Sequence, residues 1–389
     1  MNNFIFQNRT KVYFGRGCVK EYLACLTKKA GTILLAYGGG SIKANGVYDE
    51  ISGILHTAGK TVVEFAGISP HAAYAKVQEG AQLARQHKVD MILAVGGGSV
   101  MDCCKAVSLA ARYSGDIWAD FWARPGVIEA EPLPLGAVVT AAGGGSACSG
   151  RAVLTNEALK LRACRDYPAL GPCFALMDPT YTYSVPSKQV AAGGFDVLSH
   201  LMETYFSAPD TDNVSDDLLE ALMHSIIRDL RIAMQDLHNY TVRSNLMWDA
   251  ALAGNGLVQM GKQCDFVCHK MAYQLETYYP ACDHGCILAA LHPAYYRHLC
   301  QAESSKFVRF AENVWHLHRE GRTDSQLALA GIDALAAFIR ELGLPVTLKE
   351  LGMNKAQLKE IAASCSHSQG CYKKMTAEEI YSIFCACCD

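Results

Sequence analysis

The chain has 389 residues, of which half are apolar and 19% are charged, and its formal net charge is −3 at pH 7. This composition excludes an intrinsically disordered chain, and the charge balance gives no indication of binding to nucleic acid or to an anionic membrane. The length predicts two domains. No stretch reaches the roughly 18–20 apolar residues of a transmembrane helix, and residues 1–15 do not resemble a signal peptide, so we expect a cytoplasmic protein.

In the N-terminal half, strand-like and helix-like segments alternate. The predicted strands span residues 10–15, 32–37, 61–65, 90–95 and 135–140. One predicted helix between them ends near residue 29, and three others span 47–59, 71–88 and 99–113. Two more extended segments cover 151–156 and 173–179. This alternation predicts a mostly parallel sheet with helices on both faces.

The pattern changes after residue 186. Segments such as 216–237 and 333–343 place apolar residues at helical spacing, and β-branched runs almost disappear. We therefore predict an α/β, Rossmann-like dinucleotide-binding domain over residues 1–186. An all-helical metal- and substrate-binding domain is predicted over residues 187–389, with a cleft between the two.

The sequence contains 17 cysteines, an odd number that includes the adjacent pairs Cys103–Cys104 and Cys387–Cys388. Their spacing lacks the pattern of a zinc finger or an iron–sulfur site. We interpret them as reduced thiols, buried or at the surface.

Two glycine-rich loops follow predicted strands. Gly38–Gly40 precede Ser41, and Gly96–Gly98 precede Ser99 and a predicted helix. Glycine lets the backbone approach a ligand, and the start of a helix favours an anion. Neither loop matches G-x-G-x-x-G or a P-loop, but two such loops in one domain fit a dinucleotide that lies across the strand ends. A third small-residue loop, at 138–150, is expected to close over the same ligand.

The segment 37–43 also bears on the choice of cofactor. An acidic residue at the end of this strand would hold the adenosine ribose and repel a 2′-phosphate. The segment contains no acidic residue, and Ser41 and Lys43 are present instead. The sequence therefore favours NADP(H) over NAD(H).

Asp196 and His200 lie four residues apart and share one face of a predicted helix. Together with His269 and His284 they offer an Asp/His₃ set that would suit one divalent metal, such as Fe²⁺ or Zn²⁺. Spacing alone leaves a second interpretation open, because an Asp/His pair on a helix is often only hydrogen-bonded.

Several motifs together resemble those of a known family. They are YGGGSIKANGVYDEI, ILAVGGGSVMDCCKAV, AVLTNEALK, MDPTYTYSVPSKQVAAGGFDVLSHLMETYFS and CDHGCILAALHP. Their combination resembles the iron-containing (group III) alcohol dehydrogenases, in particular the butanol dehydrogenase branch, and the likeness runs nearly end to end. The resemblance implies a metal-dependent enzyme that reduces aldehydes with NADPH or NADH and forms at least a dimer.

Position by position, the resemblance also implies roles for individual residues. The implied metal ligands are Asp196, His200, His269 and His284. The implied adenosine-side contacts are Gly38, Gly39 and Ser41, and the implied pyrophosphate contacts are Gly97, Gly98 and Ser99. Asp102 would lie near the nicotinamide, and Thr140 and Lys160 would contact the nucleotide.

Three positions depart from the family pattern. The third and fourth implied ligands, His269 and His284, are 15 positions apart rather than the usual 14. Counting 14 positions back from His284 gives Lys270, which is a poor ligand, so we keep His269 and infer one inserted residue. Tyr273 stands where the family carries a second histidine, although counting back from His284 gives Gln274 instead. Residues 144–147 read Gly-Gly-Ser-Ala in place of Thr-Gly-Ser-Glu.

The predicted reaction is reversible hydride transfer between NAD(P)H and a small aldehyde or primary alcohol. Tyr273 or water would supply the proton, and Asp102 is an alternative relay. Two other functions stay open: a lyase similar to dehydroquinate synthase, for which residues 260–290 lack a basic cluster, and a non-catalytic nucleotide-binding protein. The apolar residues near the N-terminus, NNFIF, predict pairing with another subunit and hence a homodimer.

Overall fold

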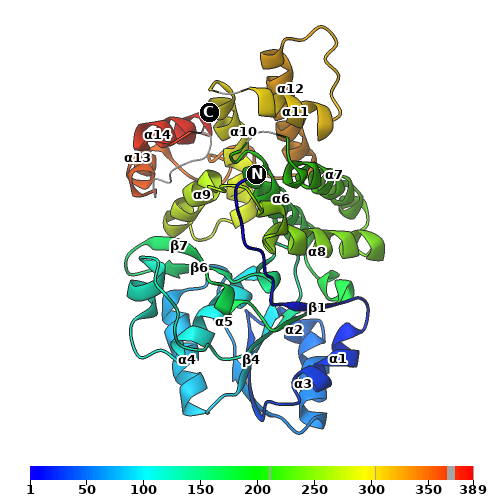
Figure 1. Cartoon of the computed structure of the whole chain (residues 1–389), viewed down its shortest axis with the longest axis vertical. Helices are drawn as coiled ribbons and strands as arrows, with labels where there is room; N and C mark the ends of the chain where they lie inside the picture. The colour runs from blue at the N-terminus through cyan, green and yellow to red at the C-terminus, as the bar shows by residue number, and fades with distance from the viewer. Residues whose placement is uncertain (210–211, 303, 366–372, 389) are drawn as a thin grey trace. The chain divides into compact units, whose positions relative to one another are not determined.

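The computed structural model describes residues 1–209, 212–302, 304–365 and 373–388 (Figure 1). The chain divides into two compact units. We call residues 7–185 and 238–255 the sheet unit, and residues 1–6, 186–237 and 256–389 the helical unit.

The sheet unit is built on a six-stranded, entirely parallel sheet with the order β1-β8-β5-β4-β2-β3. The strands are β1 (Lys11–Phe14), β2 (Thr32–Tyr37), β3 (Thr61–Phe65), β4 (Met91–Gly96), β5 (Leu135–Val139) and β8 (Phe174–Met177). A separate antiparallel ribbon consists of β6 (Arg151–Asn156) and β7 (Leu161–Asp166). The predicted parallel sheet is confirmed.

Helices cover both faces of this sheet. They are α1 (Cys18–Leu26) and α3 (Val47–Thr57) on one face and α4 (Tyr74–Gln86) and α5 (Gly98–Ala110) on the other. The sheet unit also contains α2 (Ser41–Ala44) and α8 (Tyr240–Gly254). Side chains alternate along each strand, so Leu34 joins the core beneath α4 and α5, whereas Leu35 joins the core beneath α1 and α3. Burial on both faces explains why β2 is apolar throughout.

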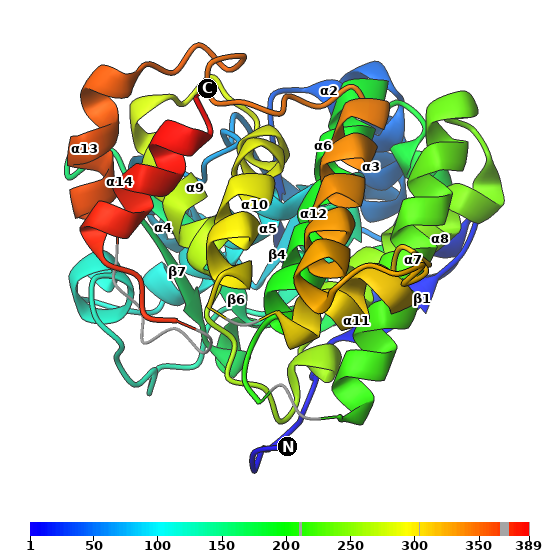
Figure 2. The same ribbon diagram turned by 90° about the horizontal axis from the view of Figure 1, so that it is seen from above.

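The helical unit contains no strand among its described residues. Its helices are α6 (Ser187–Tyr205), α7 (Val214–Gln235), α9 (Val267–Tyr278), α10 (His284–Cys300), α11 (Ser305–Asn313), α12 (Asp324–Glu341), α13 (Lys355–Ser364) and α14 (Ala377–Ala386). Helix α10 packs against both α6 and α9 (Figure 2). None of the helices in the described parts of the chain combines the length and the apolar character needed to cross a bilayer.

Candidate functional site

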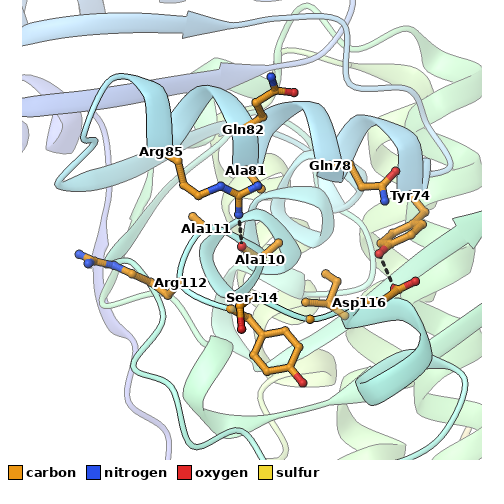
Figure 3. Close-up of a pocket in the computed structure, with 13 residues that line it drawn as sticks. Tyr74, Gln78, Ala81, Gln82, Arg85, Ala110, Ala111, Arg112, Ser114 and Asp116 are labelled. Atoms are coloured by element: carbon orange, nitrogen blue, oxygen red, sulfur yellow. Dashed lines mark hydrogen bonds between the residues drawn. The ribbon is translucent and has the colours of Figure 1, made fainter.

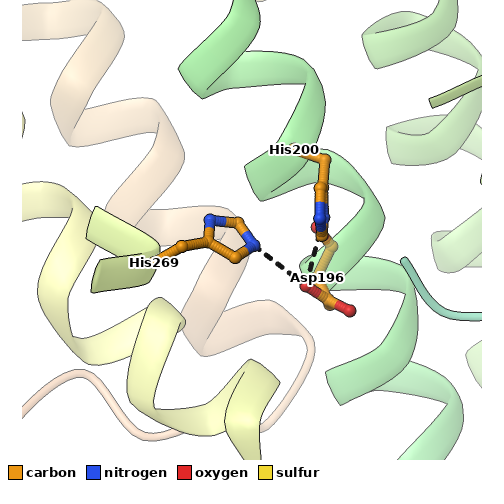
Figure 4. Close-up of side chains that lie close together, drawn as sticks. All are labelled: Asp196, His200 and His269. Atoms are coloured by element: carbon orange, nitrogen blue, oxygen red, sulfur yellow. Dashed lines mark hydrogen bonds and ion pairs between the residues drawn. The ribbon is translucent and has the colours of Figure 1, made fainter. Parts of the chain in front are cut away.

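Helices α6 and α9 bring three of the predicted metal ligands together. Asp196 and His200 lie one turn apart on α6, and His269 lies in the first turn of α9. One ligand atom from each residue lies within 4.8 Å of the others. Figure 4 shows the three side chains pointing toward one another. Oδ1 of Asp196 is 3.4 Å from Nε2 of His269 and 3.3 Å from Nδ1 of His200. The three residues form one compact group.

His284 lies beside this group. It is the first residue of α10, and its Nε2 is 3.7 Å from Oδ1 of Asp196. A close approach of α10 to α6 brings it there, since a Cβ atom on Gly285 would lie 2.0 Å from the carbonyl oxygen of Ala192. All four predicted ligands are therefore neighbours, although their joint binding of a metal stays a prediction.

Oxygen atoms behind the imidazoles fix how the rings are turned. Glu203 accepts hydrogen bonds from Nδ1 of His269 and from the backbone N–H of Cys268, and Glu276 accepts one from Nδ1 of His284. Nδ1 of His200 donates to the carbonyl oxygen of Asp196 at 2.9 Å. Each bond to Nδ1 leaves Nε2 as the nitrogen available to a metal. The sequence patterns did not identify Glu276 as a partner of His284.

The electrostatics of the group fit a divalent cation. Burial raises the pKa of Asp196, but the positive charge of the neighbouring histidines, His200 first, lowers it more, so its pKa lies well below the ordinary value and the carboxylate is ionised. Oδ1 of Asp196 and Nε2 of His269 are buried without a hydrogen-bond partner among the described residues. Carboxylate oxygen and imidazole nitrogen are the donors that Fe²⁺ and Zn²⁺ accept.

The two glycine-rich loops lie at the carboxyl ends of neighbouring strands. Gly38 and Gly39 follow β2, and Ser41 begins α2. Gly97 is the N-cap residue of α5, whose first residues are Gly98 and Ser99. This is the edge at which open parallel sheets bind dinucleotides. Thr140 lies there too, because its N–H donates to the carbonyl oxygen of Gly96, the last residue of β4. Lys160 lies in the turn between β6 and β7.

The third small-residue loop is held from two sides. Gly145 adopts a φ of +70°, and its Cβ atom would lie 2.2 Å from the carbonyl oxygen of Ala250 in α8. Asp102 accepts hydrogen bonds from Oγ of Ser146 at 2.5 Å and from the N–H of Val153 at 3.1 Å. A pocket of about 30 Å³ lies between this loop and the loop that follows β4. Asp102 thus anchors the loop that borders the predicted nucleotide site.

Comparisons with known proteins agree with this arrangement. A family model described as iron-containing alcohol dehydrogenase matches residues 9–179, and one described as the C-terminal part of the Fe-containing alcohol dehydrogenase family matches residues 190–388. The chain belongs to the iron-containing alcohol dehydrogenase family. Within this family it belongs to the butanol dehydrogenase-like branch.

Three members of the family show how similar this chain is to known proteins in sequence and in structure. NADH-dependent butanol dehydrogenase A of Clostridium acetobutylicum is 33% identical and aligns over 99% of both chains. NADPH-dependent aldehyde reductase YqhD of Escherichia coli is 34% identical over 92% of this chain and 91% of its own. The crystal structure of NADH-dependent butanol dehydrogenase A from Thermotoga maritima superimposes with a TM-score of 0.94, at 32% identity, over 100% of this chain and 99% of that one. The predicted family and fold class are confirmed.

Tyr273, one of the departures from the family pattern, lies next to the predicted metal ligands. It follows His269 by one turn of α9, and its ring stacks on that of His284 with centroids 5.5 Å apart and an interplanar angle of 17°. The aromatic ring therefore covers one face of a predicted ligand. Its role as a proton donor stays a prediction.

Lys43 has a partner that the sequence did not reveal. Its Nζ lies 3.1 Å from Oε2 of Glu64, near the end of β3. Glu64 also accepts hydrogen bonds of 2.5 Å from the hydroxyls of Tyr37 and Tyr48. Glu64 lies outside the segment 37–43 and reaches Lys43 from the neighbouring strand.

The sheet unit also has a larger pocket, of about 710 Å³, between α4 and residues 110–117 (Figure 3). Arg85 donates to the carbonyl oxygen of Ala110 on one side of it, and Tyr74 donates to Asp116 on the other. None of the predicted site residues lines this pocket. The candidate site is therefore defined by its chemical groups and not by the size of a cavity.

Proposed function

We propose that this chain catalyses reversible hydride transfer between NAD(P)H and a small aldehyde or primary alcohol, and that the reaction depends on a divalent metal. The observation that carries the proposal is the group formed by Asp196, His200 and His269, with His284 beside it. The printed names of the relatives, butanol dehydrogenase and aldehyde reductase, support the same reaction class.

The metal-binding residues would be Asp196, His200, His269 and His284, with Fe²⁺ or Zn²⁺ as the expected ions. When bound, such a cation supplies Lewis-acid polarisation of a carbonyl oxygen. Glu203 and Glu276 hold the imidazoles of His269 and His284 so that Nε2 of each faces Asp196. Because the rings are already oriented, little reorganisation is needed on binding.

Other residues would bind the nucleotide and move the proton. We assign adenosine-side contacts to Gly38, Gly39 and Ser41, and pyrophosphate contacts to Gly97, Gly98 and Ser99. Thr140 and Lys160 complete the proposed nucleotide contacts. Asp102 would stay near the nicotinamide as the anchor of Ser146, and Tyr273 would donate the proton to the reduced substrate.

The preference between the two cofactors is a separate question. The lack of an acidic residue over 37–43 and the presence of Lys43 favour NADP(H). The pairing of Lys43 with Glu64 favours NAD(H) instead, because the carboxylate neutralises the ammonium charge that would bind the 2′-phosphate of NADP(H).

We also propose that the chain forms a homodimer and acts in the cytoplasm. In the segment Met1–Phe6, Phe4 is 51% and Ile5 is 98% exposed, so the segment leaves apolar surface that a second copy could cover. Strand β1 lies at an edge of the sheet, where it pairs with β8 on one side and with no other strand of the described residues. A second copy of the chain is the proposed partner.

Turnover with and without metal tests the proposed function. Metal-stripped protein is mixed with butyraldehyde and either NADPH or NADH, Fe²⁺ or Zn²⁺ is then added, and the loss of reduced nicotinamide is followed. We expect oxidation only after metal is added, and none with His284→Ala. Turnover that is unaffected by stripping, or absent with both metals, both cofactors and a panel of short aldehydes, would contradict the proposal.

A further inference from the structure

Four side chains meet at the carboxyl ends of β2 and β3. The carboxylate of Glu64 accepts hydrogen bonds from Tyr37 and Tyr48, each at 2.5 Å, and pairs with Nζ of Lys43 at 3.1 Å. The ammonium of Lys43 also lies 4.4 Å from the centre of the Tyr48 ring. The carboxylate is therefore fixed by two neutral donors and one cation, although Glu64 and Lys43 are both partly exposed.

The position of this cluster relates it to the adenosine end of the proposed nucleotide site. Tyr37 is the last residue of β2, and Lys43 lies in the short helix that follows the first glycine-rich loop. Glu64 is opposite Leu35 in the register of β2 and β3, one residue before β3 ends. In doubly wound sheets, the charge at such a strand end decides how the adenosine ribose is recognised.

The charges in this cluster balance within the protein. A 2′-phosphate carries about −1.5 to −2 charge, so it needs a cation whose charge is not already neutralised. Lys43 is the cation nearest to the first loop in sequence, and its ammonium is bound by a carboxylate. That carboxylate would also repel a phosphate placed beside it.

We propose that Glu64 is a specificity-determining residue, which favours NAD(H) over NADP(H) by neutralising Lys43 and by placing a negative charge where a 2′-phosphate would bind. The proposal rests on the proposed use of a nicotinamide dinucleotide and identifies which one the site prefers. The hydrogen bonds from Tyr37, Tyr48 and Lys43 lower the pKa of Glu64 to about 2, so the carboxylate is ionised at every working pH.

The experiment compares binding of two nucleotide fragments by titration calorimetry, without any substrate. The probes are ADP and adenosine 2′,5′-bisphosphate, which differ in where the second phosphate is attached. The proteins are the wild type, Glu64→Gln and the double variant Glu64→Gln/Lys43→Met. The control is Glu341→Gln, which removes a carboxylate of similar exposure that is paired with Arg231 in the helical unit.

We expect Glu64→Gln to raise the affinity for the 2′-phosphate probe relative to ADP about tenfold, the size of one hydrogen bond to a charged group. The double variant should lose this gain, and Glu341→Gln should resemble the wild type. An unchanged ratio in Glu64→Gln, or a gain that persists without Lys43, would overturn the proposal. If the wild type binds neither probe, the proposed nucleotide site itself fails, and this inference fails with it.

Discussion

Each of the three histidines predicted as metal ligands has its Nδ1 bound to an oxygen atom, and the sources of these oxygens differ. His200 uses the carbonyl of Asp196, whereas His269 and His284 use the carboxylates of Glu203 and Glu276. A carboxylate behind an imidazole fixes the tautomer and makes the ring a stronger ligand. The affinity for metal should therefore depend on residues that do not touch the ion.

Glu276→Gln tests this dependence. The amide keeps the size of the side chain but removes its negative charge, so we expect about 10- to 100-fold weaker metal binding. The measurement is competition for Zn²⁺ against a chelator, with no cofactor or substrate present. Glu360→Gln is a matched control, because Glu360 accepts a hydrogen bond from Tyr278 of the same helix. Equal affinities of Glu276→Gln and the wild type would contradict this account.

Lys105 provides a test of pH dependence in the sheet unit. Its side chain is 0% exposed, and burial lowers its pKa to about 8, below the ordinary value of 10.5. Between these two values the unfolded chain binds more protons than the folded chain, so the free energy of unfolding should rise with pH.

The rise should total about 3 kcal/mol, because one pK unit corresponds to about 1.4 kcal/mol. The destabilisation of the folded state by the buried Lys105 ammonium is fully present below about pH 8, and it is relieved as the pH increases towards 10.5. Urea unfolding of the wild type and Lys105→Met at several pH values measures this difference. Identical pH dependence of the two proteins would show that the buried ammonium has no such effect.

At the scale of elements, the packing of α10 on α6 depends on a residue without a side chain. A Cβ atom at Gly285 would lie 2.0 Å from the carbonyl oxygen of Ala192, so Gly285→Ala must separate the two helices. Because Asp196 lies on α6 and His284 on α10, the same separation would move a predicted ligand away from the group.

We expect Gly285→Ala to destabilise the fold by about 1–3 kcal/mol and to weaken metal binding. Gly53→Ala in α3 is the control, because a Cβ atom there meets nothing within 4 Å and alanine is the better helix former. It should stabilise the protein by up to about 1 kcal/mol. Denaturant unfolding measures both. A neutral effect of Gly285→Ala would mean that α6 and α10 do not need this close approach.

At the scale of the whole molecule, the proposed homodimer depends on the N-terminal residues. Ile5→Asp places a charge at the most exposed of the large apolar side chains near the N-terminus. We expect the wild type to sediment as a dimer and Ile5→Asp to shift towards the monomer, while Glu360→Gln stays dimeric. A wild type that is monomeric at high concentration would contradict the proposed dimer.

Much of the sheet was predictable because its strands are short apolar runs between helices. The predicted strands at 32–37 and 61–65 have the observed bounds of β2 and β3. Strand β7 was not predicted, because its sequence LRACRD has no apolar alternation. Helix α8 lies in the sheet unit, although its residues look like those of the helices around it. Helical periodicity carries no information about which unit a helix packs against.

The site was predictable where sequence spacing determines proximity. Asp196 and His200 lie one turn apart on a single helix, so their nearness follows from the helix itself. The resemblance to a family, and not the spacing, connected them with His269 and His284. Glu64 and Glu276 were not predicted. Glu64 meets Lys43 because β2 and β3 pair, and Glu276 meets His284 because the chain turns back before α10. Such contacts depend on tertiary structure that local patterns do not encode.

The most direct test of the central claim is the fate of the hydride. Butyraldehyde is incubated with metal-loaded protein and NADH or NADPH that carries deuterium at C4 of the nicotinamide, and the alcohol product is examined by mass spectrometry. Direct transfer predicts butanol with deuterium at carbon 1 and loss of the label from the cofactor. Butanol without deuterium from cofactor labelled on either face, or no butanol at all, would contradict the proposed dehydrogenase.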